Sequence, residues 1–191
     1  MAKLFKCFVL SALASLTLFG CKSTESYSRN YTAANTEKIG IALTDQQAEQ
    51  VAQQFVATFN QLGTAAFLGK ADKLYADSLY INDTLSQFSS KPELMKHFQG
   101  MNARVSQVDV RLISVTYQKD SAYVHWYMAY HFKIFGKNKP MASYGISQIK
   151  INQQQQIIFQ QDFWDPADGL YRHLPYMGSI YTWLLPFKKS N

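Results

Sequence analysis

Apolar residues between positions 44 and 102 recur at the three- and four-residue spacing of amphipathic helices. The first segment, 44–62, opens with a capping box of Thr44 and Gln47. Its apolar stripe consists of Ala48, Val51, Ala52, Phe55, Phe59 and Leu62. A second, shorter helix is expected over 64–77. A third is expected within 89–101, with Ser90 as its N-cap and a proline in its first turn. The pattern therefore predicts three helices with one apolar face each.

Beyond Gly100 the spacing changes from helical to alternating. Four runs rich in β-branched and aromatic residues follow, at 105–117, 122–135, 141–152 and 157–164. The polar breaks between them are short, which favours an antiparallel meander. Helices followed by hairpin-linked strands predict an α+β domain.

The first 20 residues have a different character from the rest of the chain. Lys3 and Lys6 precede an uncharged apolar run that ends in Gly20, directly before Cys21. This order is typical of a secretory signal peptide, and the run is short for a transmembrane helix. We therefore expect residues 1–20 to be removed from the mature protein.

The sequence LFGC, residues 18–21, resembles the lipobox of bacterial lipoproteins, although Phe19 departs from the small residue usual there. The resemblance implies acylation of Cys21 and cleavage before it. Several acyl chains on one cysteine give lasting attachment to a bilayer. Lys22, in place of an aspartate, implies sorting to the outer membrane if the host has one. The alternative is an ordinary secreted protein with Cys21 free.

Composition restricts the mature domain further. Cys7 and Cys21 are the two cysteines of the chain, so a mature domain beyond Cys21 has neither a disulfide nor a thiolate metal site. Loss of Lys3 and Lys6 lowers the net charge from +6 to +4, with the basic residues spread along the chain. That charge is typical of a solvated surface, and we expect no nucleic-acid partner.

We divide the chain into four regions. Residues 1–20 are the signal peptide, and 21–38, rich in Ser, Thr and Asn, are expected to form a flexible tether. Residues 39–165 form the folded domain. Residues 166–191 form a helical, amphipathic and aromatic tail, expected to pack on the domain or, alternatively, on a membrane surface.

Two helices are followed by the stretch LYADSLYINDT at 74–84, a helix after KPEL and four strands ending in DFWD. This order resembles the SnoaL-like and ketosteroid-isomerase-like branch of the nuclear transport factor 2-like superfamily. The resemblance covers about 44–165. It implies a cone in which helices pack on a strongly bent antiparallel sheet around an apolar pocket. It also implies pairing of two copies through the sheet face.

The same resemblance places Asp83 at the position of the catalytic base. Phe55 then falls where a tyrosine stabilises the enolate oxygen, and Ser147 where a protonated aspartate does so. Phenylalanine cannot donate a hydrogen bond, and loss of one such donor costs about 3 kcal/mol of transition-state stabilisation. The alternative for Asp83 is a strand-end residue whose carboxylate accepts local N–H groups, and this interpretation is favoured.

Other candidates follow from strand alternation in 121–135. One face carries His125, Tyr127 and His131, and it faces either the pocket or a partner. His125 and His131 are too far apart for a ligand pair, so no metal is expected, and no cofactor is implied. Asp162 is a second acid candidate, whereas Asp165, before Pro166, is expected to cap a helix. The expected ligand contacts are Phe55, Phe59, Asp83, His125, Tyr127, Ser147 and Trp164.

Two functions remain open from the sequence. The first, which we favour, is a lipid-anchored envelope module that binds a small apolar ligand or a protein partner without catalysis. The second is an envelope enzyme, such as an isomerase, cyclase or hydrolase, with Asp83 as its general base. An enzyme needs Asp83 and a second polar group within reach of one buried space, whereas a binding module needs only the pocket.

Overall fold

The computed structural model describes residues 21–174, and the chain divides into two compact units between Glu37 and Lys38. The described part of the first unit is helix α2 (Cys21–Glu37). We expected a flexible tether over 21–38 and no helix there, and the structure shows this segment as helical. The segment contains neither glycine nor proline, so nothing interrupts a helix. The hydroxyls of Thr32 and Thr36 donate to backbone carbonyls one turn back.

The second unit contains the three predicted helices, α3 (Asp45–Phe59), α4 (Phe67–Leu74) and α5 (Lys91–Asn102). The capping box at Thr44 is confirmed, because its hydroxyl accepts from the Gln47 backbone and the Gln47 side chain accepts from Thr44. Ser90 is the N-cap of α5, without a side-chain hydrogen bond. Helix α4 ends three residues earlier than predicted, where the chain becomes extended.

The sheet has six strands: β1 (Tyr75–Asn82), β2 (Gln87–Ser90), β3 (Val105–Gln118), β4 (Ser121–Ile134), β5 (Lys137–Ile151) and β6 (Ile157–Trp164). Their order is β2-β1-β6-β5-β4-β3. Strands β3 to β6 form the predicted antiparallel meander. The purely antiparallel sheet that we expected is wrong at one place, since β1 runs parallel to β6. The α+β class is confirmed.

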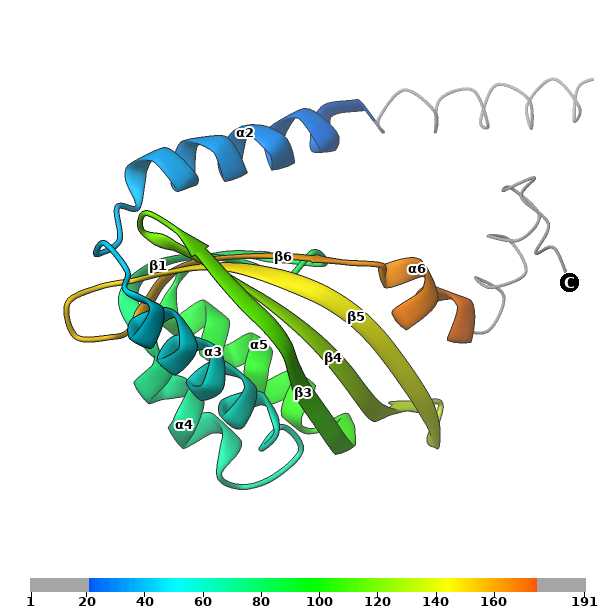
Figure 1. The fold of residues 1–191 in the computed structure, drawn as a ribbon. Helices are drawn as coiled ribbons and strands as arrows, with labels where there is room; N and C mark the ends of the chain where they lie inside the picture. The colour runs from blue at the N-terminus through cyan, green and yellow to red at the C-terminus, as the bar shows by residue number, and fades with distance from the viewer. Residues whose placement is uncertain (1–20, 175–191) are drawn as a thin grey trace, which may run out of the picture. The chain divides into compact units, whose positions relative to one another are not determined.

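The sheet is strongly curved and covers helices α3, α4 and α5 on its concave side (Figure 1). Its hydrophobic core lies between the sheet and these helices. The core includes Phe55, Phe67, Leu94 and Ile149, each at most 4% exposed. Beyond β6, the described part of the C-terminal tail begins with the short helix α6 (Pro166–Gly169), followed by a 3-10 turn at Tyr171–His173. The remainder of the tail, 175–191, and the signal peptide lie outside the described residues.

Gly145 on β5 leaves room for the indole of Trp126 on β4. A Cβ atom at this position would lie 2.4 Å from the Trp126 ring. Trp126 is itself 8% exposed and is held by a hydrogen bond from Nε1 to Ser147 Oγ. A methyl group at position 145 would therefore displace a packed side chain.

We expect Gly145→Ala to lower the free energy of unfolding by about 1–3 kcal/mol, the usual range for overpacking a core. Urea denaturation measures this change. Gly69→Ala is the matched control, since a Cβ there meets nothing within 4 Å and alanine favours the helix. An equally stable Gly145→Ala protein would contradict the packing described here.

Candidate functional site

A cavity of about 460 Å³ lies between the concave face of the sheet and the helices. Most of its lining is apolar, including Phe55, Phe59, Leu94, Trp126, Met128 and Phe132. Phe59 packs at a ring-centroid distance of 4.8 Å from Phe55 and 5.8 Å from Phe98. Phe55 and Phe59, two of the expected ligand contacts, thus both line the cavity. A cavity of this size and lining is typical of sites for small, mostly apolar molecules.

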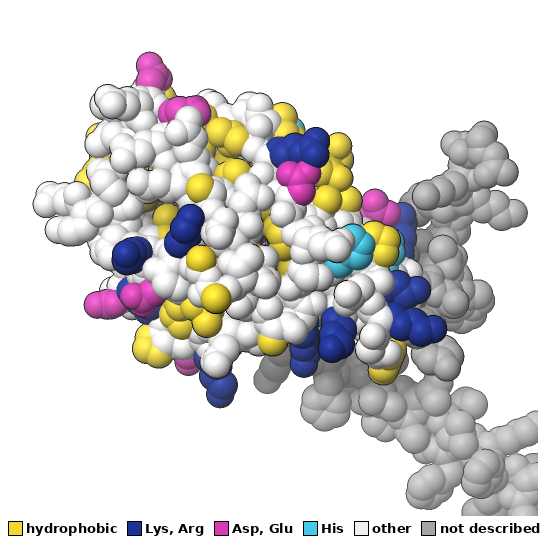
Figure 2. Space-filling view, turned by 90° about the horizontal axis from the view of Figure 1, so that it is seen from below, with side chains coloured by type: hydrophobic (Ala, Val, Ile, Leu, Met, Phe, Trp, Pro, Cys, Tyr) yellow, Lys and Arg dark blue, Asp and Glu magenta, His cyan; other side chains and the backbone are white. Residues whose placement is uncertain are grey.

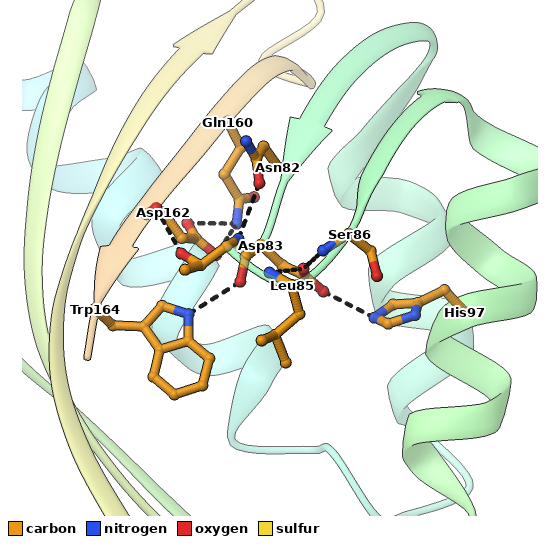
Figure 3. Close-up of polar contacts among 9 residues, drawn as sticks. Asn82, Asp83, Leu85, Ser86, His97, Gln160, Asp162 and Trp164 are labelled. Carbon is orange, nitrogen blue, oxygen red and sulfur yellow. Dashed lines mark hydrogen bonds and ion pairs between the residues drawn. The ribbon is translucent and has the colours of Figure 1, made fainter. Parts of the chain in front are cut away.

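Asp83 follows the end of β1 and borders this cavity (Figure 3). Its Oδ1 atom accepts hydrogen bonds from the backbone N–H groups of Leu85 and Ser86, at 2.9 and 2.7 Å. This is the strand-end geometry that the sequence favoured. The same carboxylate also faces a second partner, because Oδ2 lies 2.9 Å from Nε2 of His97. Asp83 therefore takes part both in the local turn after β1 and in a pair with His97 on helix α5.

His97 was not among the predicted site residues. It lies on α5, one helical turn after the buried Leu94, so helical spacing places it on the inner side. Its ring packs against Phe88 at 4.8 Å. On the other side of Asp83, the indole of Trp164 donates to the Asp83 carbonyl at 2.9 Å (Figure 3). Trp164 lines the cavity, as predicted.

Asp162 on β6 is the second carboxyl group at the cavity. Its Oδ1 accepts from Ser147 Oγ at 2.7 Å and from Gln160 Nε2 at 2.9 Å. Burial raises the pKa of this carboxyl to about 7, and the nearby charge of Asp83 adds to the rise, while the two hydrogen bonds oppose it. Asp162 is therefore the acid that can exchange a proton near neutral pH.

A chain of buried hydrogen bonds supports Asp162. Tyr75 donates from its hydroxyl to Gln160 Oε1 at 2.7 Å, and Trp126 donates to Ser147 at 2.9 Å. Burial raises the pKa of Tyr75 well above its ordinary value, with smaller effects from Asp162 and Asp83. The predicted Ser147 thus belongs to the site through Asp162, although it does not line the cavity itself. Sequence reasoning missed Tyr75 and Gln160.

His125 and Tyr127, which we expected among the ligand contacts, do not line the cavity. Trp126 and Met128 line the cavity, and alternation along β4 places their neighbours on the opposite face. There, Tyr127 packs against Tyr144 at 4.9 Å between ring centroids. The structure therefore selects the second alternative, a polar and aromatic outer sheet surface.

Three further observations concern Asp165, metal ligands and membrane-spanning helices. Asp165 caps α6 by accepting from the N–H groups of Ala167 and Asp168, as predicted, and does not border the cavity. Within residues 21–174, no group of three His, Cys, Asp or Glu side chains is arranged to hold a metal ion. In the same range, no helix is long and apolar enough to cross a membrane.

Comparison with solved structures identifies the fold. The chain superimposes on an LEH-like epoxide hydrolase from M. tuberculosis with a TM-score of 0.52 and 14% identity, covering 65% of this chain and 86% of that one. For a SnoaL-like polyketide cyclase structure from Shewanella denitrificans the TM-score is 0.55 and the identity 13%, and the match covers 63% of this chain and 92% of that one. For a nuclear transport factor 2-like protein of unknown function from Exiguobacterium the TM-score is 0.53 and the identity 8%, and the match covers 60% of this chain and 98% of that one.

No family model matches the sequence, and no curated protein matches it. At identities this low, the structural likeness establishes the fold alone. The chain has the same fold as these SnoaL-like and nuclear transport factor 2-like structures, as predicted from the order of its elements.

Proposed function

We propose that this domain binds a small, mostly apolar molecule that carries one polar group, with the polar group held at Asp162. The observation that supports this is the combination of an apolar cavity of about 460 Å³ and a carboxyl whose pKa is raised to about 7 at its wall. A protonated Asp162 donates a hydrogen bond to a carbonyl or hydroxyl, which an ordinary aspartate at neutral pH does not. The surrounding apolar side chains supply the burial.

We further propose that the domain works at the bacterial cell envelope, attached to the bilayer through acylated Cys21. The lipobox-like sequence supports this attachment, and so does the order of residues 1–20, in which two lysines precede an apolar run. Outer-membrane sorting is the corresponding expectation from Lys22. Attachment to a bilayer would also favour ligand binding, because apolar molecules concentrate in the bilayer to which the protein is attached.

Native mass spectrometry of the full chain, purified from its own envelope, tests both proposals. We expect a co-purifying small molecule and a mass excess of acyl chains on Cys21. Asp162→Asn should keep the ligand above about pH 7, where the wild type loses it, because an amide donates a hydrogen bond at every pH whereas the carboxyl donates only when protonated. Asp165→Asn is the matched control, since asparagine caps a helix as well as aspartate. A ligand-free wild-type protein would contradict the binding function.

A second candidate, proton-transfer catalysis, is favoured by one observation. Ser147 occupies the position that the family resemblance assigns to a protonated aspartate, and Asp162 lies directly opposite it on the adjacent strand. The hydrogen bond between them places a carboxyl beside that position. A pKa of about 7 suits a general acid or base at neutral pH. Asp162, rather than Asp83, is then the proton-transfer group, and Asp162→Asn would accumulate a precursor because an amide cannot transfer the proton.

We also propose that two copies pair through the outer face of the sheet. Tyr144, Ile146 and Phe163 are 63%, 42% and 50% exposed there, and Ile146 lies opposite Phe163 across β5 and β6. Neighbouring exposed apolar side chains of this kind mark interaction surfaces.

We expect Ile146→Glu to weaken self-association at least about tenfold, because burying an unpaired charge at an interface is unfavourable. Sedimentation velocity over a concentration series measures it. Gln153→Glu adds the same charge in an exposed turn and should leave association unchanged. A wild-type protein that is monomeric throughout the series would overturn the pairing.

A further inference from the structure

The β4–β5 hairpin ends in a two-residue turn with an unusual sequence. Ile134 pairs with Lys137, so Phe135 and Gly136 alone form the loop. Both have positive φ, at 46° and 78°. This is the arrangement of a type I′ turn, in which asparagine, aspartate or glycine is strongly preferred at both positions.

Phe135 gains nothing from the fold in return for this conformation. A left-handed backbone costs a residue with a Cβ atom about 1–2 kcal/mol. The side chain is 86% exposed, more than any other large hydrophobic residue described in 21–174. A strained, exposed aromatic residue therefore points to a role outside the domain core.

The residues around Phe135 are basic. Lys133, Lys137 and Lys139 are exposed, and none forms an ion pair within the described part of the chain. Residues 121–161, which contain the whole hairpin, include no aspartate or glutamate. The tip thus combines one exposed aromatic ring with three uncompensated positive charges.

The hairpin tip lies at one end of the ligand cavity. The backbone N–H of Lys133 donates to the carbonyl of Arg104 at 2.9 Å, and Arg104 and Phe132 both line the cavity. Lys96, another exposed basic residue, also borders it. Several Lys and Arg side chains lie close together at the lower right of the face shown in Figure 2, and others are scattered over it.

We propose that the tip of the β4–β5 hairpin docks on an anionic lipid bilayer, with Phe135 inserted among the headgroups and the three lysines on the lipid charges. Aromatic rings favour the interface of a membrane, and lysines bind its negative surface. Docking at this end brings the cavity edge formed by Arg104 and Phe132 close to the lipid. This contact goes beyond the proposed ligand binding and is separate from acylation of Cys21.

A probe at the tip tests the proposal in the mature chain, residues 21–191, without the apolar signal peptide. Cys21→Ser removes acylation and the remaining thiol, and Phe135→Cys carries a polarity-sensitive fluorophore. Vesicles contain phosphatidylcholine alone or with about one third phosphatidylglycerol. The matched control carries the fluorophore at Lys119→Cys, in the exposed turn at the opposite end of β4.

We expect a blue shift, and quenching by a lipid-borne quencher, for the probe at 135 on anionic vesicles and not for the probe at 119. Each lysine near an anionic surface contributes roughly fivefold in affinity, so changing all three to glutamine should weaken the response on the order of 100-fold. About 0.5 M salt should weaken it as well. Equal responses at 135 and 119, equal responses on neutral and anionic vesicles, or no response at 135 would each overturn the proposal.

A variant with the native lysines separates insertion from folding. Phe135→Asn places a preferred residue in the turn and should keep or raise the melting temperature. We expect it to bind anionic vesicles at least about fivefold more weakly than the wild-type tip in the same mature Cys21→Ser background, measured by vesicle flotation. Unchanged binding by Phe135→Asn would show that the ring does not insert.

Discussion

Asp162→Asn should make the protein more stable than the wild type as the pH rises, gaining about 2–3 kcal/mol relative to it between about pH 4.5 and pH 8. Most substitutions at a buried hydrogen-bond network destabilise. The opposite is expected here because the wild-type carboxyl must ionise at high pH in a place that disfavours its charge. Asparagine keeps an oxygen that can accept from Ser147 and Gln160 and never ionises.

The direction follows from the pKa of Asp162. Burial raises it from 3.8 to about 7 in the folded protein, so the folded state binds the proton more tightly than the unfolded state. The stabilisation from this proton is complete below about pH 4, falls as the pH rises, and is lost above about pH 7. The carboxyl keeps part of its surface open to the cavity, so we expect less than the full 1.36 kcal/mol for each tenfold difference in proton affinity between the two states.

Urea denaturation of both proteins across this pH range provides the measurement. Titrating groups away from the site contribute equally to the two proteins, so the difference between them reports Asp162 together with the neighbouring charge of Asp83. Asp165→Asn should show a pH-independent difference from the wild type, because Asp165 serves as a cap outside the cavity. A constant gap between Asp162→Asn and the wild type would show that Asp162 titrates normally, and the proposed proton donor would be lost.

Much of the fold follows from local sequence patterns. The stripe of Ala48, Val51 and Phe55 predicts α3, and alternation predicts β3 to β6 with their hairpins. The parallel pairing of β1 with β6 could not be predicted in this way. It joins segments about 80 residues apart, and such pairings depend on how the whole sheet curls rather than on either strand.

The site was less accessible to sequence reasoning. Asp83 and Asp162 were identified as acids, but the sequence does not show that the two carboxyl groups have different hydrogen-bond partners. That difference arises from β5, whose Ser147 lies opposite Asp162, and from the loop after β1, whose N–H groups satisfy Asp83. Likewise, alternation separates His125 from Trp126 but does not say which of the two faces the helices cover.

A large side chain at position 100, in place of Gly100, should block the cavity without disturbing the fold. The expected result is loss of ligand binding. Gly100 lies in α5, borders the cavity, and a Cβ atom there would meet nothing within 4 Å. Gly100→Trp therefore places an indole in open space at the cavity. Replacing a helical glycine should also leave the helix as stable or more so.

We expect Gly100→Trp to weaken binding of an apolar fluorescent probe, 1-anilinonaphthalene-8-sulfonate, on the order of 100-fold. An indole that excludes roughly 120 Å² of apolar contact removes about 3 kcal/mol at about 25 cal/mol per Å². Fluorescence titration measures the dissociation constant. Gly69→Trp is the matched control, because Gly69 is also a helical glycine with open space around it but does not border the cavity. If both variants bind the probe as the wild type does, the probe binds elsewhere; if both lose binding equally, the loss does not depend on blocking this cavity. Selective loss in Gly100→Trp, with its unfolding free energy retained, would assign the apolar ligand to the space between the sheet and α5.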